Sequence, residues 1–290
     1  MAEELTVLHK AGLPRGYSTG WPLIDQFYTI APGFWTVITG IPSHGKSAWV
    51  DNVMLNLISQ GWKFIIYSPE NQPHALHLAH LIEKFTKRPF RHGYHNRLEP
   101  VDIAEAVGTL DESIRILAFD GGAAFPSINT VMFTAHEILD EWNEGPVGVI
   151  VDPWNELDHA PLAGLTETQM INHELMVWRQ WIRDHGKQVH GFIIAHPQKP
   201  SRGRNGEFTR IGLYDINGSA AWYNKSDGGV IIRRTTDEFI TEIEVEKCRF
   251  RHLGKKGSAF LRFNPGTQTY EDAEMRGGSY RSIDQDGDSF

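Results

Sequence analysis

The sequence predicts an α/β fold with a mostly parallel central sheet flanked by helices and an antiparallel extension at its C-terminal end. Three features indicate it. From Trp21 onward, apolar segments of strand length alternate with amphipathic segments of helix length. The early strands are continuously apolar rather than alternating, which is typical of parallel strands covered on both faces. The last predicted strands follow one another after short turns, as antiparallel strands do.

The order of the elements follows from this pattern. Strands are predicted at residues 35–39, 64–68, 114–119, 147–152, 191–196, 228–233, 241–247 and 259–264. Helices are predicted at residues 47–59, 73–86, 100–110, 128–143 and 168–185. Together they form one domain over residues 17–270. Residues 1–16 are a polar lead-in or linker, and residues 271–290, rich in Gly, Ser, Asp and Arg, are expected to be a disordered tail.

Composition narrows the class of protein. The chain has 290 residues, a net charge of −8 and a single cysteine, so it forms no internal disulfide and fits a reducing cytoplasm. Its first residues lack the basic start and apolar core of a signal peptide, and no apolar run approaches the ~20 residues that cross a bilayer. We therefore expect a cytoplasmic protein with no membrane partner. The acidic balance argues against a surface coated by nucleic acid but leaves room for a local basic channel.

Residues 40–47 form a complete phosphate-binding loop between a predicted strand and a predicted helix. A glycine-rich turn in this position points backbone N–H groups and the positive end of the helix at a phosphate. Lys46 would reach the terminal phosphates of a nucleotide, and the hydroxyl of Ser47 would hold Mg²⁺. The alternative is a glycine turn beside a buried lysine. The residues of the loop are Gly40, Ile41, Pro42, Ser43, His44, Gly45, Lys46 and Ser47.

Two carboxylates follow apolar strands and could complete a hydrolytic site. Asp152 ends the strand at residues 147–152, where a metal-bridging aspartate belongs; otherwise it caps the next turn. Glu70 follows the strand at residues 64–68, which we expect to neighbour the strand before the phosphate loop. A carboxylate at that edge of the sheet can orient or deprotonate the attacking water. A role in capping the following helix is equally compatible with the sequence.

A histidine and a basic loop follow the next apolar strand. His196 ends this strand and could hydrogen-bond the γ-phosphate, although a lone histidine is more often only a satisfied polar side chain. The loop at residues 197–216 is long and rich in Gly and Pro, and loops of this length are usually functional or mobile. Its cations could meet a phosphate backbone, or they could form an ordinary solvated face. They are Lys199, Arg202 and Arg204.

Two further cations lie two residues apart on a predicted C-terminal strand. Lys247 and Arg249 therefore share one face of that strand. Two cations aimed together suit a γ-phosphate, and an arginine of this kind can come from a neighbouring subunit. A pair of exposed charges at a strand edge is the alternative.

Taken in order, these motifs resemble the RecA-like P-loop NTPase core of DnaB-like replicative helicases, above all phage and prophage primase-helicases and Twinkle-type helicases. The resemblance covers roughly residues 17–270, and the ordered set is far more specific than any member. Besides the phosphate loop and the Asp152 and His196 strands, it includes residues 18–25 (STGWPLID), 68–70 (SPE), 217–221 (NGSAA), 226–227 (SD) and 247–250 (KCRF).

The resemblance implies roles for individual residues. Glu70 becomes the catalytic base, His196 the phosphate sensor, and Lys247 and Arg249 trans-acting residues at a subunit interface, with Arg249 as the finger. Arg234 and Phe263 fall where the family packs the nucleotide base. The residues that would line a central channel and grip single-stranded DNA are Lys199, Arg202, Arg204, Asn217, Gly218 and Ser219.

The resemblance also implies cofactors and partners, and the chain departs from it in places. It implies ATP and Mg²⁺, single-stranded DNA, a homo-oligomer in the form of a hexameric ring, and a primase or other replication proteins. Asn224 stands where relatives often carry glutamine, which affects a phosphate contact. No zinc-ribbon cysteines or primase fold precede the core, so we expect no primase activity. The short N-terminus lacks a clear linker helix, so hexamerisation is expected to be weak.

The sequence thus predicts an ATP-dependent DNA helicase motor with active sites shared between subunits. Two other classes remain open at this point. One is a RecA- or KaiC-like ATPase that uses nucleotide as an assembly switch without unwinding. The other is a nucleotide-binding interaction module recruited by a separate replication protein.

Overall fold

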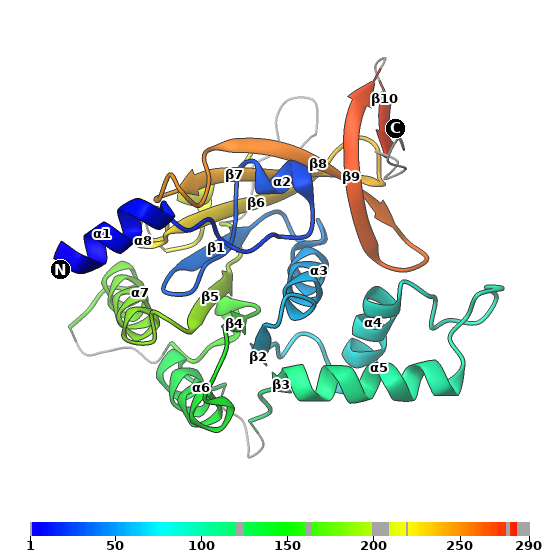
Figure 1. Ribbon diagram of the computed structural model, residues 1–290, viewed down its shortest axis with the longest axis horizontal. Coiled ribbons are helices and arrows are strands. Elements are labelled where there is room, and N and C mark those ends of the chain that lie inside the picture. Colours follow the sequence, from blue (N-terminus) through cyan, green and yellow to red (C-terminus); the bar gives the residue numbers. More distant parts are fainter. Residues whose placement is uncertain are drawn as a thin grey trace.

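A single ten-stranded sheet runs through the molecule (Figure 1). The structure is a computed structural model that describes residues 2–119, 125–159, 164–198, 209–218, 220–276 and 279–282. The strand order is β10-β9-β8-β7-β6-β1-β5-β4-β2-β3. The sheet divides into a parallel part, from β6 to β3, and an antiparallel part, from β6 to β10. The predicted fold class is confirmed.

The parallel part contains the strands that the apolar runs predicted. They are β1 (Trp35–Thr39), β2 (Lys63–Tyr67), β3 (Ile114–Ile116), β4 (Val147–Val151), β5 (Val189–Ile194) and β6 (Gly228–Arg234). Every residue of β1, β4 and β5 is buried, because helices cover both faces of these strands. β3 is shorter than predicted and pairs only with residues 64–66 of β2.

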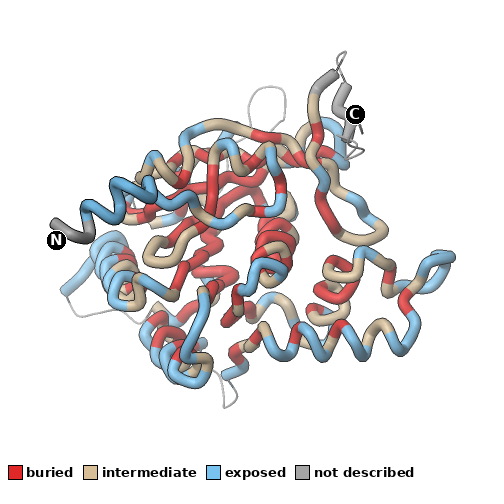
Figure 2. Tube along the Cα trace, in the orientation of Figure 1, coloured by how far each residue is buried: buried red, intermediate tan, exposed pale blue. Residues whose placement is uncertain are grey.

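Helices form one layer on each face of the sheet. On one face lie α3 (Lys46–Ile58), α4 (His74–Thr86) and α5 (Pro100–Ser113), and on the other α6 (Ile128–Trp142) and α7 (Glu167–Asp184). Successive strand residues point to opposite faces, so Val37 and Ile38 belong to different cores. Figure 2 shows these cores as buried segments along the strands and the inner sides of the helices. Among the described residues, no helix is long and apolar enough to cross a membrane.

The antiparallel extension is longer than the sequence indicated. It consists of β7 (Ile240–Cys248), β8 (Gly257–Asn264), β9 (Thr269–Arg276) and β10 (Ser279–Ser282). The prediction of a disordered tail from residue 271 is therefore wrong for residues 271–276 and 279–282. β9 covers the edge of β8, whose backbone groups would otherwise lack strand partners. Tyr270 and Ala273 anchor it, because both side chains are buried.

Three short helices were not predicted. They are α1 (Ala2–Ala11), α2 (Pro22–Asp25) and α8 (Ala221–Lys225). α1 falls in the predicted polar lead-in, which is therefore helical over residues 2–11. Its Ala, Glu, Leu and Lys residues have good helix propensity. Its residues 5–11 are exposed. Because the helix does not pack an apolar face on the core, its sequence lacks the amphipathic pattern that would have predicted it.

Candidate nucleotide-binding site

The phosphate loop connects the carboxyl end of β1 to the start of α3. Gly45 has φ +89°, a conformation that favours glycine, and a Cβ there would lie 2.8 Å from the hydroxyl of Tyr270. A Cβ on Gly40 would lie 2.4 Å from the carbonyl oxygen of Ile232 on the neighbouring strand β6. Both positions therefore require glycine. The N-terminal end of α3 directly follows the loop, with Gly45 as its N-cap, and would supply N–H groups to a phosphate.

Lys46 lies within the loop that it is predicted to serve. Its side chain is buried, and Nζ donates hydrogen bonds to the carbonyl oxygens of Gly40 at 2.9 Å and Ile41 at 3.3 Å. Burial lowers the pKa of the lysine, while the carboxylates of Asp152 and Glu70 oppose that shift. Phosphate oxygens could take the place of the two carbonyls, since both are hydrogen-bond acceptors and phosphate adds full negative charge.

Asp152 and Ser47 meet where a cation would bridge to phosphate. Asp152 directly follows β4, is 5% exposed and forms a side-chain hydrogen bond with Ser47. Burial raises the pKa of Asp152 to about 7, and the hydrogen bond from Ser47 opposes this shift. A carboxylate and a hydroxyl are oxygen donors of the kind that Mg²⁺ prefers. A bound cation would also stabilise the ionised carboxylate that burial disfavours.

Glu70 and His196 belong to the same edge of the sheet. The prediction that the strand before Glu70 neighbours β1 is wrong, because β2 pairs with β3 and β4 while β1 pairs with β5 and β6. Glu70 is nevertheless close enough to influence the pKa values of Lys46, Asp152 and His196. Burial and the nearby Lys46 ammonium lower the pKa of His196, whose backbone N–H donates to Oδ1 of Asn155 at 3.0 Å.

The predicted base-binding residues lie on the antiparallel side of the loop. The backbone N–H of Arg234 donates to Nδ1 of His44 at 3.2 Å, which ties the end of β6 to the phosphate loop. The ring of Phe263 packs against Tyr270 with centroids 5.1 Å apart. Sequence reasoning missed Tyr270. It lies 225 residues from Gly45 in the chain, at a position that was taken for the end of the domain, so no local signal identified it.

A buried polar network under the loop was also missed. Asp51 of α3 pairs with Lys84 of α4 at 3.0 Å and with His77 at 3.3 Å. Nε2 of Gln268 donates to the buried carboxylate of Glu83 at 2.6 Å. The network joins the helix that follows the phosphate loop to the helix that follows Glu70.

The structure places the two predicted trans-acting cations away from this site. β7 is antiparallel to β6, so Cys248 lies beside Gly228, and Gly228 in turn lies beside Thr36 near the start of β1. The phosphate loop follows the opposite end of β1. Lys247 and Arg249 therefore lie at the other edge of the sheet from the phosphate loop of their own chain.

At that opposite edge, both cations are held by neighbouring groups. Arg249 forms an ion pair with Asp227 at 3.1 Å and donates to the carbonyl oxygen of Asn224 at 2.6 Å. Lys247 donates to the carbonyl oxygen of Tyr223 and lies 4.9 Å above the centre of that tyrosine ring. Burial, reinforced by the charge of Arg249, lowers the pKa of Lys247 to about 8.

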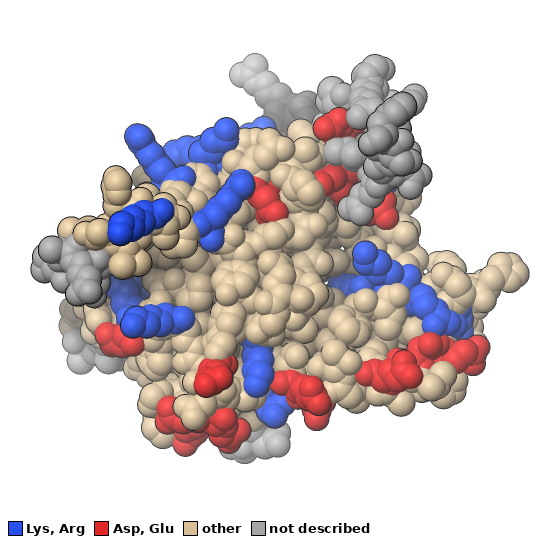
Figure 3. All heavy atoms as spheres, in the orientation of Figure 1, with Lys and Arg blue, Asp and Glu red and all other residues tan. Residues whose placement is uncertain are grey.

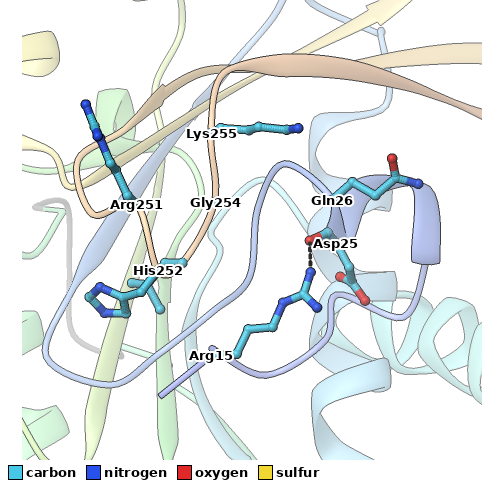
Figure 4. Close-up of a pocket in the computed structure, with 8 residues that line it drawn as sticks. Arg15, Asp25, Gln26, Arg251, His252, Gly254 and Lys255 are labelled. Carbon is cyan, nitrogen blue, oxygen red and sulfur yellow. Dashed lines mark hydrogen bonds between the residues drawn. The ribbon is translucent and has the colours of Figure 1, made fainter. Parts of the chain in front are cut away.

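The same edge carries a cationic hollow of about 370 Å³. Arg15, Arg251 and Lys255 surround it, and Arg15 donates to the carbonyl oxygen of Asp25 at 3.2 Å (Figure 4). On the face seen in Figure 3, basic side chains gather around α1 and the turn between β7 and β8, whereas acidic ones gather along α5 and α6. A second group of basic side chains lies on the same face over α4 and the segment that leads into α5.

Only part of the predicted DNA-binding set can be placed. Lys199, Arg202, Arg204 and Ser219 lie outside the described residues. The backbone N–H of Asn217 donates to the carbonyl oxygen of His196 at 3.3 Å. Gly218 has φ +90°, and a Cβ there would lie 2.1 Å from Cδ1 of Ile171 on α7. The predicted DNA segment is therefore joined to the backbone of the predicted phosphate sensor.

Comparisons with known proteins find one similar curated protein and many chains of similar fold. The Twinkle homolog protein, chloroplastic/mitochondrial, of Arabidopsis thaliana is 33% identical over 277 residues, covering 92% of this chain. The chain spans 38% of that relative's length. No family model matches.

Solved structures show the same fold. The ATPase domain of G40P superposes with a TM-score of 0.75 at 18% identity, covering 94% of this chain and 98% of that one. A DnaB-like replicative helicase, described with its interactions with primase, gives 0.74 at 18% identity, covering 92% and 66%. The RadB recombinase gives 0.56 at 17% identity, covering 89% and 99%. These matches show that the chain is similar over most of its length to a Twinkle homolog and has the RecA-like fold of the ATPase domains of DnaB-like replicative helicases.

Proposed function

We propose that this chain hydrolyses ATP with Mg²⁺ as the motor of a ring-forming DNA helicase that translocates on single-stranded DNA. Each active site forms between two copies of the chain. One copy supplies Lys46, Ser47, Asp152 and Glu70, and the next supplies Lys247 and Arg249. Glu70 activates the attacking water, His196 responds to the γ-phosphate, and Arg234 and Phe263 flank the base.

The observation that carries this proposal is the separation of the two sets within one chain. The phosphate loop lies at the carboxyl end of β1, and Cys248, between the two cations, lies level with its start through β6. One copy therefore presents two half-sites that face apart. A head-to-tail arrangement joins such half-sites, and a closed ring satisfies all of them. We propose a hexamer. The hollow of about 370 Å³, whose lining includes Arg15, Arg251, Lys255 and the acidic Asp25, adds basic side chains close to Arg249 in the sequence.

DNA contact is proposed for the segment that meets the phosphate sensor. It consists of Asn217, Gly218 and Ser219 together with Lys199, Arg202 and Arg204. The support for this proposal is the hydrogen bond from the backbone of Asn217 to the backbone of His196. Through this bond, a shift of His196 in response to the γ-phosphate would act directly on the segment. A primase or another replication protein is the proposed further partner, and the cytoplasm the proposed location.

A RecA- or KaiC-like assembly switch is the second candidate. The similarity to the RadB recombinase over 89% of the chain favours it, since the fold is not confined to helicases. Displacement of a strand from a forked duplex separates the two candidates. A motor displaces the strand in proportion to ATP consumed, whereas a switch binds and hydrolyses without displacement.

The first experiment measures ATPase rate against protein concentration, with and without single-stranded DNA. Shared sites predict a rate per chain that rises steeply with concentration, and a DNA-gripping channel predicts stimulation by DNA. A rate per chain that is flat and indifferent to DNA would contradict the shared-site motor.

A further inference from the structure

α8 lies between two regions to which the proposed function gives different tasks. Its five residues follow the DNA-contacting segment at Asn217 and Gly218, and precede Asp227, the ion-pair partner of Arg249. The helix is too short to be stable by itself. Its position therefore depends on the groups that hold its two ends.

The trans-acting cations hold its C-terminal end. The carbonyl oxygen of Tyr223 accepts from Lys247, and that of Asn224 accepts from Arg249 at 2.6 Å. The last carbonyls of a helix have no partner within the helix, so these bonds satisfy groups that would otherwise need water. An Nζ or Nη2 atom that turns to a phosphate on another copy must give up its bond to α8.

The ring of Tyr223 adds a second contact between α8 and Lys247. It stacks on Tyr214 with centroids 4.6 Å apart and planes 18° apart. Lys247 lies 4.9 Å above its centre, and Lys256 donates to its hydroxyl at 3.3 Å. Cation–π attraction of this kind favours the position of Lys247 seen here. Departure of Lys247 therefore loosens the ring as well as the carbonyl.

Trp222 joins α8 to the DNA-contacting segment. Its indole is 1% exposed, and Nε1 donates to the carbonyl oxygen of Asn217 at 3.1 Å. The ring meets Trp154 edge to face at 5.2 Å, and Trp154 stands two residues after Asp152. A packed indole of this kind cannot move without displacing the group it is bonded to.

We propose that α8 couples the nucleotide on a neighbouring copy to the DNA-contacting segment of its own copy. Lys247 and Arg249 exchange the carbonyl oxygens of Tyr223 and Asn224 for phosphate oxygens across the interface. The released end of α8 shifts, and Trp222 transmits the shift to Asn217. Trp222 and Tyr223 are thus positioning residues. The inference rests on the proposed function, from which it takes the trans action of the cations and the DNA contact.

The test compares the affinity for single-stranded DNA in two nucleotide states. Anisotropy of a labelled oligothymidylate is measured with Mg²⁺ and either ADP or a non-hydrolysable ATP analogue. Trp222→Phe keeps an aromatic ring but removes the hydrogen bond to Asn217. We expect the ratio of the two affinities to fall roughly fivefold, the factor that one hydrogen bond typically carries.

A matched control is available in the same core. Trp178 is fully buried like Trp222, and its Nε1 has no hydrogen-bond partner among the described residues. Trp178→Phe therefore removes a similar ring area without breaking such a bond, and we expect it to keep the wild-type ratio. Tyr223→Leu should lower the ratio, whereas Tyr223→Phe, which retains the ring, should keep most of it.

The outcomes separate the inference from the function it rests on. If wild-type protein shows no response of DNA affinity to nucleotide, the proposed function fails and the inference with it. If wild-type protein responds and Trp222→Phe behaves like Trp178→Phe, the coupling through α8 is overturned while the function stands. Thermal unfolding checks that the variants fold, and Tyr223→Leu, at a half-buried position, decides the matter if Trp222→Phe does not fold.

Discussion

The functional side chains are held in different ways at the two ends of the parallel strands, which are called here the phosphate-loop edge and the opposite edge. At the phosphate-loop edge, Lys46 and Asp152 are buried at 6% and 5% exposure, and the loop backbone fixes their positions. At the opposite edge, the side chain of Arg249 is 26% exposed and held by exchangeable contacts, an ion pair and a backbone carbonyl. A preorganised edge suits binding, and an edge of long cations on exchangeable partners suits a group that acts on another molecule.

Separate removal of the nucleotide-binding half-site and of the finger should abolish ATPase activity. Lys46→Ala removes the binding half-site, and Arg249→Ala removes the finger, which typically contributes about 10³–10⁵-fold to turnover. Each variant alone should lack ATPase activity. Mixed together they should regain it, because an intact phosphate loop from one variant meets an intact finger from the other. The measurement is steady-state ATPase of mixed subunits.

The control for this experiment is Lys187→Ala, which removes an exposed charge just before β5. It should leave the rate unchanged. A mixture of Lys46→Ala and Arg249→Ala that stays inactive under conditions of assembly would contradict the division into two half-sites.

Replacement of the proposed catalytic base should affect turnover without affecting nucleotide binding. Glu70→Gln should leave ATP binding intact and lower turnover by about 10²–10⁴-fold, because the amide cannot accept the proton of the attacking water. Binding is followed with a fluorescent nucleotide and turnover by phosphate release. Glu112→Gln, on the exposed side of α5, is the control. Unchanged hydrolysis in Glu70→Gln would remove Glu70 from the site.

Substitutions in the polar network of Asp51 and Lys84 should lower the free energy of unfolding. Lys84→Met leaves the carboxylate of Asp51 buried without its ammonium partner, which typically costs about 3–5 kcal/mol. Urea unfolding measures the change. A second substitution, Asp51→Asn, should recover part of it by removing the buried charge. Lys87→Met, at an exposed position three residues on, should cost far less.

The ATPase rate should depend weakly on pH through Lys247, at the opposite edge. Because burial and Arg249 lower the pKa of Lys247 to about 8 in the unassembled chain, its ammonium is lost there as pH rises through 8. At a protein concentration that only partly assembles the sites, the ATPase rate should therefore decline a few-fold through that range. Lys247→Arg, which stays charged, should remove this decline. Asp227 opposes the shift, while Arg179 and Lys256 add to it.

Through the same lysine, the folding stability should rise with pH, whereas the ATPase rate should fall. A lysine whose pKa is depressed in the folded state contributes stability above its unfolded pKa, and that contribution is lost as pH falls through about 8. Wild-type protein should therefore gain stability relative to Lys247→Arg between pH 8 and pH 10. Identical profiles of the two proteins would contradict the depressed pKa.

The phosphate loop, the order of the long elements and the polar residues that follow β2, β4 and β5 could all be predicted from the sequence. These features are local: a glycine turn, a continuous apolar run or a helical period can be read within a few residues. For the same reason the segments that carry no periodic signal, α1 and α8, were missed.

The neighbours of each strand and the contacts of each cation became known only from the folded arrangement. It placed β2 beside β4 instead of β1, carried the sheet beyond residue 271, and brought Tyr270 to Gly45. It also placed Lys247 and Arg249 on the carbonyls of α8, at the edge away from their own phosphate loop. Such contacts join residues far apart in the chain through strand pairing and buried charge, and neither is encoded in a short stretch of sequence.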